Sequence, residues 1–179
     1  LCNRFELPLN KRVKSLSTGN RIKLSLVMAL AHKPRLLLLD EPTSGLDPVV
    51  RSEVLDVLFS ILEDGQHTIF YSTHILADIS RLADELIFIN NGLICGRSAT
   101  TDLLENWRQL TFSADTLPGL PCLISKEQNG NDFRIVVSDN QKALEILKKS
   151  NVQNVQQSRL TIEEIAVHIL KENKHVVNH

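Results

Sequence analysis

The chain has 179 residues, enough for one domain with a sizeable core or for a core with a small appendage. Its 42% hydrophobic and 23% charged residues are an ordinary globular composition, and a formal net charge of -1 does not indicate binding to nucleic acid or to an anionic membrane surface. The sequence has no apolar run of about 18 residues and no signal-peptide pattern, so any membrane role would need a partner.

The cysteines and the first residue bear on the origin of the chain. Cys2, Cys95 and Cys122 are far apart and have no histidine at metal-ligand spacing. This pattern predicts reduced thiols of a cytosolic protein, without a disulfide framework or a zinc site. Because the chain begins at Leu1 and not at methionine, we expect it to be a piece of a longer protein.

Helices and strands are expected to alternate over residues 1–100. Ser17 is a predicted N-cap, Pro34 prevents continuation of that helix, and Asp47 followed by Pro48 predicts the next helix start. The expected elements are a helix over 17–33, a strand over 36–39, a helix from Pro48 that ends before Gly65, a strand over 68–73, a short helix over 75–83, and hairpin strands over 85–90 and 93–97 around Asn91-Gly92. Such an alternation predicts an α/β sheet.

The character of the sequence changes near residue 107, where we expect a domain boundary between 1–107 and 108–179. The second part predicts a small α+β appendage. Its expected elements, after a short helix over 102–107, are strands over 123–126 and 133–137, a helix over 141–149, a strand over 152–160, a helix over 161–171 with Thr161 and Glu164 as a capping box, and a frayed polar tail over 172–179.

The segment 16–20 opens the first predicted helix. A helix N-terminus offers unpaired backbone amides, the Ser17 hydroxyl adds a donor, and Gly19 would let a phosphate approach the backbone closely. These features suit an anion. Taken alone, the segment is more often an ordinary N-cap than an anion site.

Acidic residues and a histidine follow the predicted strands. Asp40 and Glu41 end the strand 36–39, at the edge where open α/β sheets bind ligands. Asp40 suits Mg²⁺, and Glu41 suits the orientation or deprotonation of an attacking water. His74 would lie at the same edge if the strands are parallel, where it could contact a γ-phosphate. Taken separately, the acidic pair would usually be a solvated strand end, and the histidine would usually be structural.

Together the segments resemble the ATP-binding subunits of ABC transporters. Four of them, in the order and spacing of that family, are 16–20 (LSTGN, similar to the signature motif LSGGQ), 36–41 (LLLLDE, similar to Walker B with its catalytic glutamate), 44–47 (SGLD, the D-loop) and 72–74 (STH, the switch histidine). The resemblance extends through about residue 100. It implies part of an ABC-type P-loop NTPase sheet with helices, followed by the small α+β appendage.

The resemblance also implies site roles. Two ATP-binding subunits of this family pack head to tail around two ATP molecules with Mg²⁺. By similarity Asp40 would hold Mg²⁺, Glu41 would polarise the water and His74 would steady the γ-phosphate. Nucleotide contacts across the dimer would come from Ser17, Thr18, Gly19, Asn20 and, lining the interface, Asp47.

Two departures from the family pattern affect these expectations. Thr18 and Asn20 replace the usual glycine and glutamine of the signature. None of the seven glycines precedes a lysine, so the sequence shows no P-loop. We therefore expect the chain by itself to bind ATP poorly and to expose apolar strand edges.

The resemblance implies an enzyme, the ATP-hydrolysing subunit of an ABC exporter. The subunit would be cytoplasmic, peripheral on the membrane through a separate transmembrane permease, and without a nucleic-acid partner. Residues 108–173 resemble the C-terminal extension of exporters in the drug, antibiotic and ion branch, with 161–165 (TIEEI) similar to its ending. The alternatives are a non-transport ABC ATPase and a degenerate or truncated subunit with a regulatory or interaction role.

Overall fold

The computed structural model describes residues 5–63 and 65–172. Its chain divides into two compact units, Leu1–Leu82 and Ala83–His179, which are described separately. Cys2 and the predicted tail from residue 173 onward lie outside the described residues.

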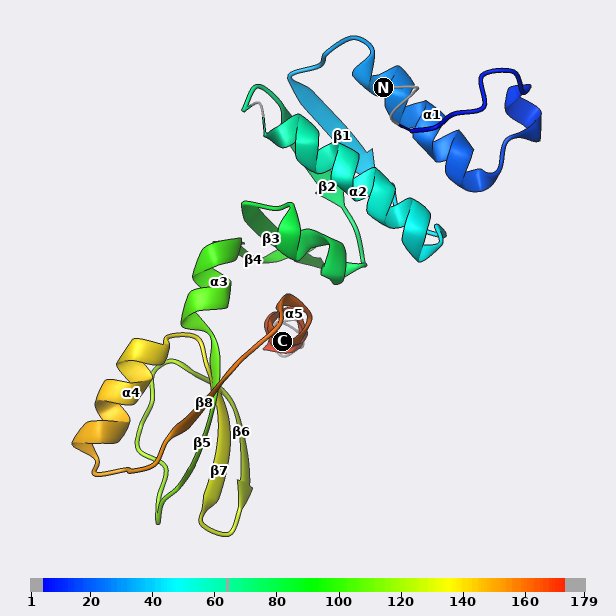
Figure 1. Cartoon of the computed structure of the whole chain (residues 1–179). Coiled ribbons are helices and arrows are strands. Elements are labelled where there is room, and N and C mark those ends of the chain that lie inside the picture. Colours follow the sequence, from blue (N-terminus) through cyan, green and yellow to red (C-terminus); the bar gives the residue numbers. More distant parts are fainter. Residues whose placement is uncertain (1–4, 64, 173–179) are drawn as a thin grey trace. The chain divides into compact units, whose positions relative to one another are not determined.

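The first unit is built around a parallel pair of strands with helices on one face (Figure 1). Its elements are η1 (Val13–Ser15), α1 (Thr18–Leu30), β1 (Leu36–Asp40), α2 (Pro48–Leu62), β2 (Thr68–Ser72) and η2 (Leu76–Arg81). β1 and β2 are parallel and in register from Leu36 opposite Thr68 to Asp40 opposite Ser72. The predicted parallel α/β arrangement is therefore confirmed.

Capping residues set the helix starts as the sequence predicts. The Ser17 hydroxyl accepts from the Asn20 amide at 3.3 Å, and Asp47 Oδ1 accepts from the Val49 and Val50 amides at 3.1 Å. The segment over 75–83 differs from the prediction, because it forms a six-residue 3₁₀ helix, η2, and not an α-helix.

The core of the first unit lies between the helices and one face of the sheet. Leu37 of β1 packs in this core with helix residues that are almost fully buried. The other members are Phe5, Leu26, Leu30, Val54, Val57 and Leu58. Lys23 of α1 and Glu53 of α2 also form an ion pair between the two helices. α1 and α2 are therefore held to the same side of the sheet.

The opposite face of the sheet is apolar and exposed. Leu36, Leu38 and Phe70 are 55%, 68% and 54% exposed. Leu38 and Phe70 are register partners, so they form one patch. The apolar run thus has the composition of a strand buried on both faces, while the described residues cover one face.

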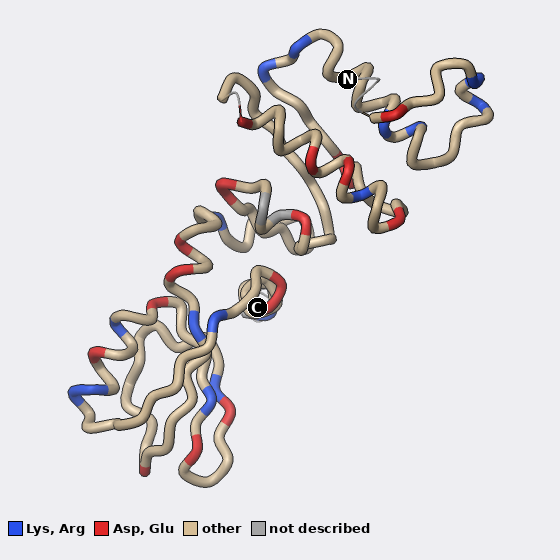
Figure 2. The backbone as a smooth tube through the Cα atoms, viewed as in Figure 1, with Lys and Arg blue, Asp and Glu red and all other residues tan. Residues whose placement is uncertain are grey.

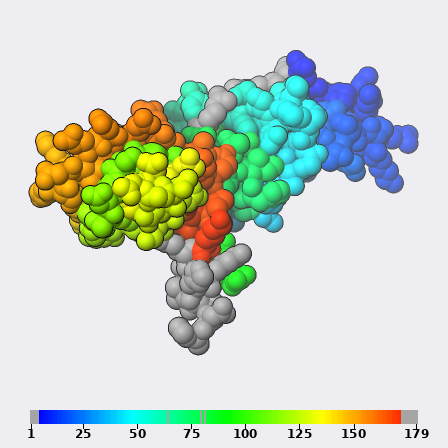
Figure 3. Space-filling view, turned by 90° about the horizontal axis from the view of Figure 1, so that it is seen from below, coloured from blue at the N-terminus to red at the C-terminus, as the bar shows by residue number. Residues whose placement is uncertain are grey.

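The second unit contains a hairpin, a four-stranded antiparallel sheet and three helices (Figure 1). Its elements are β3 (Glu85–Asn90), β4 (Leu93–Ala99), α3 (Thr100–Asn106), β5 (Arg108–Ser113), β6 (Leu123–Asn129), β7 (Asp132–Val137), α4 (Asn140–Lys149), β8 (Gln156–Arg159) and α5 (Ile162–Glu172). The strand order is β6-β7-β5-β8. α4 covers one face of this sheet (Figure 3), where Leu110, Phe133, Ile135 and Leu147 are buried together.

The predicted hairpin and capping box are both present in the second unit. Asn91 and Gly92 adopt φ angles of 50° and 76°, as a tight two-residue turn requires. Thr161 and Glu164 exchange side-chain to backbone hydrogen bonds of 2.8 and 3.3 Å at the start of α5. α5 packs on β3, β4 and α3, and a Cβ at Gly96 would come within 3.3 Å of the Ile169 side chain.

β5 is a strand that sequence analysis missed. It is an inner strand, paired with β7 on one side and β8 on the other. Its residues alternate weakly in polarity, and no turn residue marks its start directly after α3. The compact units divide after Leu82. The expected boundary near residue 107, between 1–107 and 108–179, stays a prediction.

Two neighbouring leucines of β1 should respond differently to substitution. Leu37→Ala leaves a cavity in the core and should lower the free energy of unfolding by about 2–5 kcal/mol. Leu38→Ser removes exposed apolar surface, so it should change stability little and reduce self-association of the 179-residue chain. Denaturant unfolding and sedimentation velocity measure the two effects. Equal effects of the two substitutions on the free energy of unfolding would contradict a core that lies on one face of the sheet.

Candidate functional site

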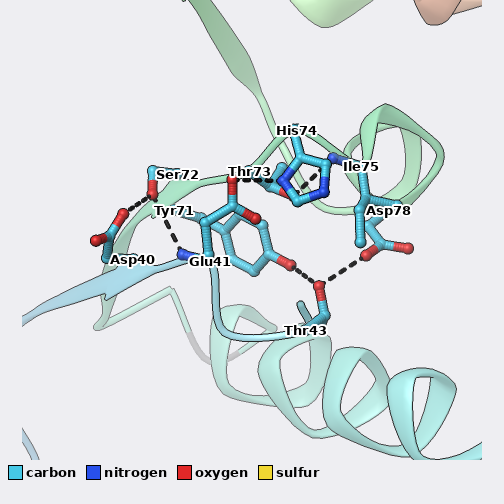
Figure 4. Close-up of polar contacts among 9 residues, drawn as sticks. All are labelled: Asp40, Glu41, Thr43, Tyr71, Ser72, Thr73, His74, Ile75 and Asp78. Carbon is cyan, nitrogen blue, oxygen red and sulfur yellow. Dashed lines mark hydrogen bonds and ion pairs between the residues drawn. The ribbon is translucent and has the colours of Figure 1, made fainter. Parts of the chain in front are cut away.

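The carboxyl ends of β1 and β2 bring three predicted residues together (Figure 4). Asp40 is the last residue of β1, Glu41 follows it, and His74 lies two residues beyond the end of β2. Because the strands are parallel and in register, both chains leave the sheet at the same edge. The expected convergence of Asp40, Glu41 and His74 at this edge is therefore observed.

Ser72 connects the two strand ends. Its hydroxyl donates to Asp40 Oδ1 at 2.5 Å and accepts from the Glu41 amide at 3.3 Å. The Glu41 amide also donates to the Ser72 carbonyl at 3.1 Å. Asp40 is thus held through one carboxylate oxygen, and its side chain points away from that of Glu41 (Figure 4).

Glu41 and His74 form the central pair of the site. Glu41 Oε1 lies 2.7 Å from His74 Nδ1. Glu41 has a φ of 47°, a left-handed conformation that costs roughly 1–2 kcal/mol for a residue with a Cβ. Its second oxygen, Oε2, is buried and has no hydrogen-bond partner among the described residues. A strained backbone and an unsatisfied carboxylate oxygen at one residue are typical of a functional site.

A buried polar cluster lies directly beside this pair. The Thr43 hydroxyl lies 2.7 Å from Tyr71 Oη and 3.0 Å from Asp78 Oδ2. Sequence analysis assigned no functional role to Thr43, Tyr71 or Asp78. The one available signal was their spacing, since Thr43 lies two residues after Glu41 and Asp78 four residues after His74.

The tip of α1 takes no part in this cluster. Among residues 5–63 and 65–172, Ser17, Thr18 and Asn20 make no hydrogen bond to Asp40, Glu41 or His74, and the Ser17 hydroxyl caps its own helix. A Cβ at Gly19 would lie 3.0 Å from the Val50 side chain. Gly19 therefore permits close packing of α1 against α2. Its expected role toward a phosphate remains a prediction.

Asp47 lies at the start of α2. Its carboxylate is exposed and is occupied by the two backbone amides that it caps. This satisfies the helix N-terminus locally. Its expected place at a dimer interface stays a prediction.

Asp40 has the chemistry that Mg²⁺ requires. It is exposed, and its carboxylate has one oxygen bonded to Ser72, which leaves the other for a hard cation. The described residues contain no group of three or more histidine, cysteine, aspartate or glutamate side chains that could hold a metal ion. Mg²⁺ often binds proteins through one or two carboxylates together with substrate phosphates and water, and Asp40 fits that mode.

Basic and acidic residues are both distributed along the backbone of each unit (Figure 2). Glu53 and Asp56 lie on the exposed side of α2, and Arg21 and Lys23 lie on α1.

None of the helices in the described part of the chain has the length and apolar character needed to cross a bilayer.

Comparison with known proteins finds similarity to one family. The family model described as "ABC transporter" matches residues 3–44. The chain is 34% identical over 116 residues to the ABC transporter ATP-binding protein YtrB of Bacillus subtilis, covering 65% of this chain and 40% of that protein. The chain is therefore similar to ABC transporter ATP-binding proteins, and the family model ends at Ser44, within the predicted D-loop. The Walker B, D-loop and switch-histidine assignments remain predictions.

Other relatives carry names for transport in either direction. The chain is 38% identical over 102 residues to the Nod factor export ATP-binding protein I of Rhizobium etli, covering 57% of this chain and 32% of that protein. Further relatives are named as thiamine import and phosphate import ATP-binding proteins. The chain spans about 40% or less of the length of the curated relatives named here.

A solved structure supports the fold assignment. The chain resembles an ATP-binding cassette solved as a dimer with ADP and phosphate, with a TM-score of 0.50 and 23% identity. The match covers 55% of this chain and 43% of that chain. Together with the parallel β1–β2 pair, this likeness places the sheet in the P-loop NTPase fold of ABC ATPases.

Alkaline pH should destabilise the first unit through Tyr71. Burial is the largest cause that raises the pKa of its phenol above the ordinary 10.0, and the negative charge of Asp78 adds to it. The neutral phenol is therefore favoured in the folded state. The resulting stability is complete below pH 10.0 and is lost as pH rises through the higher folded-state pKa.

Tyr71 is the only tyrosine in the sequence, so tyrosinate absorbance reports this residue alone. We expect tyrosinate to form at higher pH in the folded chain than in the denatured chain. Tyr71→Phe should flatten the alkaline fall in unfolding free energy. Identical tyrosine titrations in the folded and denatured chains would refute the effect.

Proposed function

We propose that the subunit containing this chain hydrolyses ATP and thereby drives transport through a separate membrane permease. The observation that carries the proposal is the pairing of Glu41 with His74 beside Asp40 at the carboxyl ends of two parallel strands. Open α/β sheets bind their ligands at this edge. Similarity to ABC transporter ATP-binding proteins supports the same reaction.

The three side chains suit different parts of phosphoryl transfer. Glu41 is proposed as the base that orients and deprotonates the attacking water, because its Oε2 lacks a hydrogen-bond partner among the described residues. His74 holds the other oxygen of Glu41 and is proposed to donate to the γ-phosphate. Catalysis of this kind consists mainly of positioning and electrostatic stabilisation.

Asp40 is proposed to hold Mg²⁺. When bound with ATP, the ion supplies positive charge to the phosphate oxygens. The Ser72 hydroxyl bonds Asp40 and the Glu41 backbone together, so it would keep the metal-binding carboxylate and the base at a fixed separation.

A second ATP-binding subunit and a permease are the proposed partners. The exposed helix tip at Ser17 makes no contact with the Glu41–His74 pair among the described residues, which agrees with an action on ATP held by an opposite subunit. Thr18, Gly19 and Asn20 would contribute to that contact, and Asp47 would line the interface. The proposed location is the cytoplasmic face of the membrane.

Export is the proposed direction of transport. Its support is the C-terminal part of the chain, where 161–165 resembles the ending found in the drug, antibiotic and ion exporter branch. Relatives with import names and relatives with export names both match, so their names favour neither direction. Cells that overproduce the intact transporter should accumulate less of the transported compound than cells carrying its Glu41→Gln form, and greater accumulation would indicate import.

Glu41→Gln tests the proposed base. In the full-length protein it should lower kcat for ATP hydrolysis by about 10²–10⁴-fold, because glutamine cannot accept the proton from water. The KM for ATP should change little. Glu145→Gln, which changes an exposed glutamate of α4, is the matched control and should leave kcat unchanged. Full hydrolysis by the Glu41→Gln protein would contradict the assigned role.

The chain by itself should bind ATP weakly. None of its seven glycines is followed directly by a lysine, so a P-loop that cradles the β- and γ-phosphates is not encoded in this sequence. Titration calorimetry with Mg-ATP should detect little binding by the 179-residue chain. A dissociation constant of about 1 μM, equivalent to about 8 kcal/mol, would mean that this chain holds the nucleotide without such a loop.

A further inference from the structure

Three hydrogen-bonded polar side chains lie beside the Glu41–His74 pair. Thr43 is 0% exposed and Asp78 is 6% exposed, while Tyr71 is half-buried. The three side chains come from three different segments of the first unit (Figure 4). Thr43 belongs to the loop after β1, Tyr71 to β2 and Asp78 to η2.

The hydrogen bonds of this network have a definite direction. The carboxylate of Asp78 accepts and does not donate, so Thr43 gives its single hydroxyl proton to Asp78 Oδ2 at 3.0 Å. The Tyr71 phenol must then donate to Thr43 Oγ1 at 2.7 Å. Arg51 Nη1 lies 3.9 Å from Asp78 Oδ1 and compensates the buried charge. A buried network whose members are all partnered is rigid.

The network joins the two chain segments that carry Glu41 and His74. Glu41 is separated from Thr43 by one residue, and His74 lies on the segment that connects Tyr71 with Asp78. The Thr43–Asp78 and Thr43–Tyr71 hydrogen bonds therefore fix the backbone on both sides of the Glu41–His74 contact. Figure 4 shows the two sets of contacts side by side.

We propose that Thr43, Tyr71 and Asp78 are positioning residues that hold Glu41 against His74 for ATP hydrolysis. The inference rests on the proposed function. Loss of the Thr43 hydroxyl leaves Tyr71 and Asp78 without their shared partner and releases the loop that carries Glu41. A displacement of a reacting group by about 1 Å can lower the rate about 100-fold.

The primary test compares substitutions of Thr43 in the full-length protein. Thr43→Val keeps the size of the side chain and removes the hydroxyl, so kcat should fall about 10- to 100-fold with the KM for ATP unchanged. Thr43→Ser retains the hydroxyl and should restore kcat. Tyr71→Phe should have a smaller effect, because the Thr43–Asp78 bond remains.

A matched control separates positioning from a general loss of buried hydroxyl groups. Thr100 is also buried, and its hydroxyl donates to the Ala83 carbonyl at 2.5 Å in the second unit. Thr100→Val should leave kcat unchanged. An equal loss of kcat in Thr100→Val and Thr43→Val would overturn the proposal.

A double-mutant cycle tests whether Thr43 acts through Glu41. If it does, the protein carrying both Thr43→Val and Glu41→Gln should hydrolyse ATP no more slowly than the protein with Glu41→Gln alone. If the double substitution lowered kcat by the product of the two single losses, Thr43 would act independently of Glu41, and the proposal would be overturned. Full activity of the Glu41→Gln protein is a different outcome, because it contradicts the proposed function itself.

Amide hydrogen exchange decides the positioning role without reference to activity. The Ser44 amide donates to the Glu41 carbonyl and the Leu46 amide to the Thr43 carbonyl, at 3.1 and 3.3 Å. Thr43→Val should make these two amides exchange about tenfold faster, while the Arg21 amide of α1 keeps its rate. Unchanged exchange at Ser44 and Leu46, or equally faster exchange at Arg21, would overturn the network's role.

Discussion

Parallel pairing of β1 with β2 is the constraint on which the site depends. With Asp40 opposite Ser72, both strands deliver their following residues to one edge, and Glu41 meets His74 although 33 positions separate them. A shift of register by one residue would reverse the faces of every side chain in β2. The Ser72 hydroxyl would then lose Asp40, and His74 would no longer face Glu41. The chemistry of the site is therefore a consequence of sheet register.

The same register divides the apolar residues of β1 between two environments. Leu37 faces α1 and α2 in the core, while Leu38 lies beside Phe70 on the exposed face. An apolar side chain at each of positions 36–39 suits a strand that is covered on both sides. This composition agrees with the finding that the chain spans only part of the length of its relatives.

Polar groups next to the core give the site its rigidity. Burial of Thr43 and Asp78 would be costly without partners, and the Thr43–Asp78 and Thr43–Tyr71 hydrogen bonds offset that cost. Glu41 differs, because its backbone is left-handed and its Oε2 has no partner among the described residues. Thr43 with a satisfied hydroxyl and Glu41 with an unsatisfied carboxylate oxygen thus lie two residues apart.

Local sequence determined much of this protein. The caps at Ser17, Asp47 and Thr161 set helix starts, Asn91-Gly92 set the hairpin turn, and the apolar run 36–39 set the strand that ends at Asp40. These features depend on residues that are close together in the sequence, so sequence patterns predict them. They were sufficient to predict the α/β class and the residues at the strand ends.

Tertiary structure alone decided the remaining features. The inner strand β5, the link from Ser72 to Asp40 and the Tyr71–Thr43–Asp78 network all join residues that are distant in sequence. Sequence spacing does not specify such partners, because they depend on strand register and on which helix face packs inward. The physical reason is that hydrogen bonds between distant segments form only after the apolar faces have fixed how those segments pack.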